Sequence, residues 1–94
     1  MSFELVITDE AADDLHALIE SLPSSRRRDA LDSVDAALTR LAANPRLGQS
    51  QYLARKAFHF SFRAESVGYH WGCTFLITED EAQLVVTHIF RASL

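Results

Sequence analysis

The first residues of the chain alternate between polar and apolar side chains. Within residues 2–7 the apolar set is Phe3, Leu5 and Ile7, and a period of two is typical of a strand. Thr8 follows as the expected N-cap of a helix, because its hydroxyl can accept a backbone N–H and acidic residues come directly after it. The pattern therefore predicts an opening strand that runs straight into a helix.

Two consecutive helices are expected in the rest of the first half. The first repeats apolar residues every three or four positions and ends at Pro23. The second is capped by Ser24 or Ser25 and ends at Asn44-Pro45, because a residue before proline avoids helical backbone angles. Only about three residues connect the helices, and such a short connection joins antiparallel neighbours.

After a loop over residues 45–51 the apolar period changes from helical to two. Strands are expected over residues 58–63, 69–77 and 83–91, with a charged turn at 79–81. Three strands joined by short turns form an antiparallel meander. The element order is β-α-α-β-β-β, which predicts an α+β fold. In this fold the helical hairpin packs on one face of a four-stranded, mostly antiparallel sheet.

Alternation assigns the strand side chains to two faces of the sheet. The face toward the helices is expected to hold Phe58, Phe60, Phe62, Trp71, Phe75, Val86 and His88. The opposite face is expected to hold His59, Arg63, His70, Thr74, Thr87 and Arg91. In residues 83–91 the odd-numbered and the even-numbered positions are about equally apolar. This last strand is therefore either buried on both sides or interrupted by a bulge.

The composition is that of an ordinary globular domain. The length of 94 residues fits one domain over residues 1–94, and 48% hydrophobic content excludes a disordered chain. No stretch approaches the roughly 20 apolar residues of a membrane span, and no signal-peptide pattern opens the chain. The single cysteine, Cys73, excludes an internal disulfide and a cysteine metal site. Together these features indicate a cytoplasmic protein without a membrane partner.

The charge of the chain is uneven. The formal net charge is −4, and residues 1–50 hold nine acidic residues against five arginines. Residues 51–94 hold four acidic and four basic residues together with three of the four histidines. This balance argues against a general nucleic-acid binder, because phosphate binding needs concentrated positive charge, but it leaves room for a small local site.

The element order and several motifs resemble the RelE/ParE superfamily, the toxins of type II toxin–antitoxin systems, which includes plasmid stabilisation proteins. The motifs that carry the resemblance are Phe3–Leu15, Leu41–Gly48, Gly68–Ile77 and Val85–Arg91. Their order and spacing extend over nearly the whole chain. At one position the chain departs from the superfamily pattern, because His70 stands where a second arginine is usual.

The resemblance implies a growth inhibitor that a cognate antitoxin neutralises, and a metal-independent, cofactor-free endoribonuclease that cuts mRNA, free or on the ribosome. Such cleavage needs a base for the 2′-OH, an acid for the leaving 5′-oxygen and cations for the phosphate. Histidine and arginine meet these needs. The expected catalytic residues are Arg63, His88 and Arg91. The expected RNA-binding residues are Arg55, Lys56 and His70.

A second interpretation is a ParE-like toxin that acts on DNA gyrase, or a degenerate toxin retained only as an antitoxin-binding module. The acidic balance and the histidine at position 70 favour this interpretation. Under either interpretation the antitoxin would fold onto an apolar groove or an unpaired sheet edge, because a domain this small leaves apolar surface uncovered.

Overall fold

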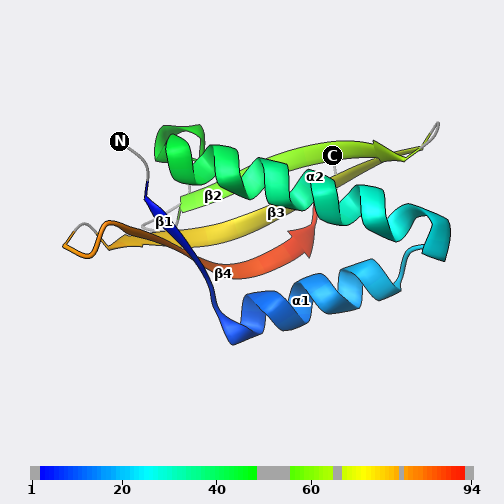
Figure 1. Cartoon of the computed structure of the whole chain (residues 1–94), viewed down its shortest axis with the longest axis horizontal. Helices are drawn as coiled ribbons and strands as arrows, with labels where there is room; N and C mark the ends of the chain where they lie inside the picture. The colour runs from blue at the N-terminus through cyan, green and yellow to red at the C-terminus, as the bar shows by residue number, and fades with distance from the viewer. Residues whose placement is uncertain (1–2, 49–55, 65–66, 79, 93–94) are drawn as a thin grey trace.

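The computed structural model describes residues 3–48, 56–64, 67–78 and 80–92. Two helices pack on a four-stranded sheet, α2 over β2 and α1 alongside β4 (Figure 1). The elements are β1 (Glu4–Ile7), α1 (Asp9–Glu20), α2 (Ser24–Ala43), the 3-10 helix η1 (Pro45–Gly48), β2 (Lys56–Ala64), β3 (Val67–Thr78) and β4 (Gln83–Arg91). This confirms the predicted α+β fold and element order. No helix in the described ranges is long and apolar enough to cross a lipid bilayer.

The sheet has the strand order β1-β4-β3-β2. β1 pairs with β4 in parallel, whereas β2–β3 and β3–β4 pair in antiparallel orientation. The parallel pair follows from the helical hairpin, which carries the chain from the end of β1 to the far edge of the sheet. The meander then returns strand by strand until β4 lies beside β1.

Thr8 fixes the start of α1 and ties it to the sheet. Its hydroxyl oxygen accepts the N–H of Ala11 at 3.1 Å, as expected for the N-cap. The same hydroxyl donates to the carbonyl oxygen of Thr87 at 3.2 Å, and the Thr8 N–H donates to the carbonyl of Val86 at 3.1 Å. One side chain therefore sets both the first helical turn and its position on β4.

The start of α2 differs from the prediction. The helix begins at Ser24 with Pro23 as its N-cap and no side-chain cap, so neither predicted serine cap forms. Instead, the Arg27 guanidinium donates to the carbonyl oxygens of Leu22 at 3.0 Å and Glu20 at 3.1 Å. A cation at the C-terminal end of α1 is favourable, because the last carbonyls of a helix carry partial negative charge. Arg27 thus links the first turn of α2 to the end of α1.

The end of α2 lies where proline was expected to place it. The helix stops at Ala43, directly before Asn44-Pro45. The next residues, Pro45–Gly48, form a 3-10 helix rather than the expected loop, and residues 49–51 of that loop lie outside the described ranges.

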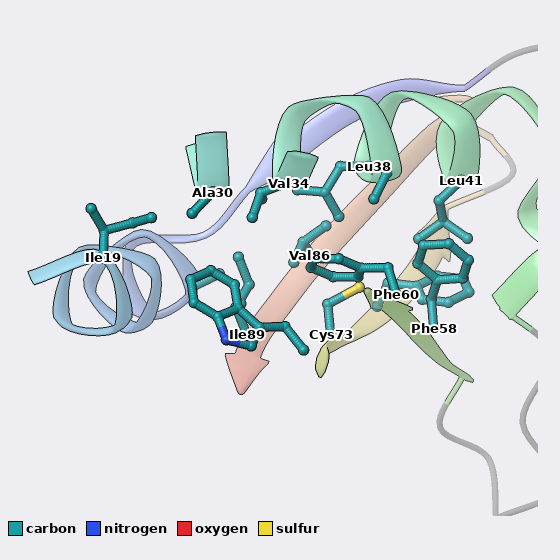
Figure 2. Packing of buried hydrophobic residues seen from close by; sticks show 14 of the residues in the cluster. Ile19, Ala30, Val34, Leu38, Leu41, Phe58, Phe60, Cys73, Val86 and Ile89 are labelled. Carbon is teal, nitrogen blue, oxygen red and sulfur yellow. The ribbon is translucent and has the colours of Figure 1, made fainter. Parts of the chain in front are cut away.

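The hydrophobic core lies between the hairpin and one face of the sheet (Figure 2). The alternate aromatic residues of β2 and β3 face the helices as predicted at Phe58, Phe60, Trp71 and Phe75, which are all buried. Burying each such ring contributes on the order of 2 kcal/mol. The side chain of Phe62, predicted for the same face, lies outside what the structure describes. The core also contains Ala11, Ile19, Leu22, Ala30, Val34, Ala37, Leu38, Leu41, Cys73, Leu84, Val86 and Ile89.

A β-bulge divides β4. Phe75 pairs with Val86 and Thr74 with His88, so Thr87 is an extra residue in β4. Val86 is buried before the bulge and Ile89 after it. The residues that face the core are therefore even-numbered before the bulge and odd-numbered after it. The bulge that the sequence left as one of two alternatives is therefore present.

Cys73 sits inside the core and is fully buried. Burial raises the pKa of its thiol from an ordinary 9.0 to about 12, and a backbone hydrogen bond from Phe58 lowers it only in part. The folded state holds this proton more tightly than the unfolded chain does. The protonated thiol therefore stabilises the fold fully below the pKa of the unfolded state, and this stabilisation is lost as the pH rises through the pKa of the folded state.

We therefore expect the free energy of unfolding to fall between about pH 9 and pH 12. Urea denaturation at several pH values measures this fall. Cys73→Ala is the control, because it removes the part of the pH dependence that comes from the thiol. An equal alkaline slope in both proteins would contradict the expectation.

Candidate functional site on the open sheet face

The face of the sheet opposite the core, called the open face below, carries polar and aromatic side chains. Its described members include His59, His70, Thr74, Leu76, Thr87, His88 and Phe90. His59, His70 and Leu76 are exposed, and Leu76 keeps 52% of its surface in contact with solvent. Among the described side chains of this face there are three histidines and no lysine or arginine.

A glycine in the central strand lets two rings meet on the open face. His59 pairs with Gly72, and Gly72 pairs with Phe90, so the three residues form one row across β2, β3 and β4. The ring centroids of His59 and Phe90 are 5.8 Å apart with an interplanar angle of 82°. A Cβ at position 72 would lie 2.8 Å from the Phe90 ring, so only glycine leaves this ring in place.

His70 stands one row further along β3 from this ring pair. It pairs with Ser61, so it is the diagonal neighbour of His59 on the same face. Diagonal neighbours in an antiparallel pair have Cα atoms roughly 7–8 Å apart, which imidazole side chains can span. The two histidines are therefore within reach of one nucleotide.

His88 lies on the other side of the ring pair, at the bulge in β4. Its side chain is 57% exposed, and its Nδ1 lies 3.4 Å from Oδ2 of Asp14 in α1. His88 is therefore not buried between the sheet and the helices as predicted, because the bulge turns the strand between Val86 and this residue, and its imidazole instead contacts Asp14 of α1 from the exposed side. His88 lines a hollow of about 330 Å³ together with Thr74, Phe75, Leu76 and Thr87.

Arg91 lies on the helix side of the sheet. It pairs with Trp71, which is 1% exposed, and it lines a pocket of about 270 Å³ with Leu18 and Leu22 of the hairpin. The prediction that Arg91 shares the open face with Arg63 is therefore wrong. The same bulge explains this error, since the alternation used for the prediction does not continue past Thr87.

The remaining predicted residues are only partly described. Arg55 lies outside the described residues. Lys56 opens β2 opposite Phe75, and Arg63 pairs with Gly68 near the end of the same strand. The side chains of Lys56 and Arg63 also lie outside what the structure describes.

Phe90 and Asp14 were not among the sequence candidates. Phe90 was missed because it shares its parity with Leu84 and Val86 in the sequence, and the bulge then moves it to the open face. Asp14 was missed because its partner lies 74 positions away in the chain. The sequence offered one indication of the bulge: the odd-numbered and even-numbered positions of β4 are about equally apolar, which is typical of an interrupted strand.

Metal chemistry has no candidate donor set in the part of the chain that the structure describes. No group of three or more histidine, cysteine, aspartate or glutamate residues gathers there. The imidazoles of the described open face can transfer protons, and the His59 and Phe90 rings can stack on unpaired bases.

Comparisons with known proteins identify the fold. No family model and no curated protein sequence matches the chain. Among solved structures, a mutant of E. coli toxin RelE with two arginines replaced by alanine, in the free state, matches with a TM-score of 0.63 and 13% identity. That match covers 99% of this chain and 86% of the other.

Two toxin–antitoxin complexes match as well. The RelBE2 complex from Mycobacterium tuberculosis has a TM-score of 0.60 and 18% identity over 98% of this chain and 93% of the other. The intact E. coli RelBE complex has a TM-score of 0.56 and 14% identity over 99% of this chain and 100% of the other. The chain therefore has the RelE toxin fold.

Proposed function

We propose that this protein is the toxin of a type II toxin–antitoxin pair, a growth inhibitor that a cognate antitoxin neutralises by binding. The RelE fold supports the proposal, and two of the similar structures are toxin–antitoxin complexes. A shared fold alone does not define an activity, which depends on the residues of the site.

We further propose that the protein cleaves mRNA with its open face. The observation that carries this proposal is that three exposed histidines, His59, His70 and His88, share the open face with the Phe90 ring, which contacts His59. Imidazole has the pKa range required for proton transfer near neutral pH, and aromatic rings stack on unpaired bases. Arg63 and the Arg55-Lys56 pair are the proposed phosphate contacts, because cleavage builds negative charge on the phosphate.

A second candidate function has its own observation. Arg91 lines the pocket on the helix side, away from the histidines, and the chain has a net charge of −4. A toxin that acts by binding a protein, such as a ParE-like inhibitor of gyrase, or a degenerate toxin that binds only its antitoxin, fits these two features better than an RNA-cleaving enzyme does.

The test is a cell-free translation reaction to which the purified protein is added. We expect protein synthesis to stop and primer extension to find cuts in the mRNA. The cognate antitoxin, added to the reaction, should restore translation. A gyrase supercoiling assay runs in parallel. Intact mRNA with blocked supercoiling would establish the second candidate, and intact mRNA with normal supercoiling would leave only antitoxin binding.

A further inference from the structure

The bulge in β4 exposes one imidazole that the strand would otherwise bury. If Thr87 took a regular position in the strand, strict alternation from Val86 would place residue 88 on the core side. The bulge is held by side chains, because the Thr87 hydroxyl lies 2.7 Å from the Thr74 hydroxyl and donates to the Thr74 carbonyl oxygen at 3.2 Å. Bulges often occur next to active sites, where they redirect a side chain.

The redirected imidazole meets a carboxylate that is itself held in place. Oδ2 of Asp14 accepts the backbone N–H of Ile89 at 3.1 Å, beyond the last residue of β4 that pairs with β1. The same oxygen lies 3.4 Å from Nδ1 of His88. A carboxylate beside Nδ1 favours the proton on that nitrogen and leaves the lone pair on Nε2.

The surroundings of this pair distinguish it from an ordinary surface contact. His88 lines the hollow of about 330 Å³ that also contains the Thr74 and Thr87 hydroxyls, and this volume is within the range of small-molecule sites. The chain has another imidazole–carboxylate pair, His16 with Glu20 at 3.1 Å. Those side chains are 74% and 62% exposed on one helix, and they line neither described pocket.

We infer that His88 is the general base for the 2′-OH of an RNA substrate bound at the hollow, and that Asp14 is its positioning residue. This inference rests on the proposed ribonuclease function and adds a carboxylate that the sequence did not suggest. Asp14 orients the imidazole and stabilises the positive charge that His88 gains, so its effect on the rate passes entirely through His88.

Nε2 of His88 takes the proton of the 2′-OH, and the 2′-oxygen forms a bond to the adjacent phosphorus. The bond from phosphorus to the 5′-oxygen breaks, which leaves a 2′,3′-cyclic phosphate on one fragment. The 5′-oxygen takes a proton from water at the exposed face, and the resulting hydroxide removes the proton from His88.

The experiment is a double-mutant cycle on mRNA cleavage in the translation reaction, with His88→Gln, Asp14→Asn and both together. The amide side chain in Asp14→Asn keeps an oxygen that can accept the Ile89 N–H, so the fold is retained. We expect His88→Gln to lower kcat about a hundredfold or more, within the range of general base catalysis. Asp14→Asn should lower kcat about tenfold with KM unchanged, and it should cause no further loss in the His88→Gln background.

Matched controls are His16→Gln and Glu20→Gln, which remove the exposed helical pair and should leave kcat unchanged. Urea denaturation of each variant shows whether its fold is intact. Additive losses in the double mutant, or an unchanged rate in His88→Gln, would overturn the inference while the ribonuclease function stands. Intact mRNA with the wild-type protein would overturn the ribonuclease function and the inference together.

Discussion

Replacing Trp71 by alanine is expected to lower the free energy of unfolding by about 3–5 kcal/mol. Trp71 is 1% exposed and lies in β3 between Phe60 of β2 and Arg91 of β4. Its loss removes the largest buried side chain and leaves a cavity where the hairpin meets the sheet. Because a small domain has only about 5–15 kcal/mol of stability in total, this one change is expected to bring the fold close to unfolding.

Urea denaturation followed by circular dichroism measures this loss. Leu76→Ala is the matched control, because Leu76 lies in the same strand but is 52% exposed on the other face. We expect the control to change the stability by less than about 0.5 kcal/mol. Similar losses in both variants would mean that the assignment of the two faces of β3 is wrong.

Replacing Gly72 by alanine is expected to lower RNA cleavage about tenfold, because stacking on an aromatic ring contributes about 1–3 kcal/mol per base. The new Cβ would lie 2.8 Å from the Phe90 ring and 3.2 Å from Cδ2 of His59. Both rings can move away into solvent, so the stability should fall by only about 1 kcal/mol. The change therefore separates the ring pair without removing any group that reacts.

Gly68→Ala is the matched control for this variant. Gly68 lies in the same strand, and a Cβ at its position has nothing within 4 Å. We expect it to cleave RNA as the wild type does. The proposed role of the His59–Phe90 ring pair would be contradicted if Gly72→Ala and Gly68→Ala had the same activity.

The fold follows from local signals that act within a few residues. Thr8 caps α1 as its hydroxyl and the acidic residues after it predict, and Asn44-Pro45 ends α2. The face that the aromatic residues of β2 and β3 occupy was predictable, because turning Trp71 or Phe75 to solvent would lose several kcal/mol of burial free energy. In contrast, the predicted serine cap of α2 does not form, and Arg27 instead donates to the carbonyl oxygens of Leu22 and Glu20 across the turn between the helices.

The candidate site was less predictable because it depends on one inserted residue. The bulge at Thr87 changes the face of every later residue in β4. His88 and Phe90 therefore move to the open face and Arg91 moves to the helix side, which is opposite to the prediction for His88 and for Arg91. The position of the bulge depends on hydroxyl contacts between β3 and β4, and a single strand sequence does not reveal such cross-strand contacts.

The proposed ribonuclease acts through the open face of its sheet rather than through the outer surface of α2. The most direct measurement compares mRNA cleavage in the translation reaction by Phe90→Glu and Leu31→Glu. Both changes add a negative charge at an apolar residue, Phe90 on the open face and Leu31 on α2, where it is 44% exposed. We predict that Leu31→Glu cuts mRNA as the wild type does and that Phe90→Glu leaves it intact. Undiminished cleavage by Phe90→Glu, or loss of cleavage in a folded Leu31→Glu variant, would contradict the claim.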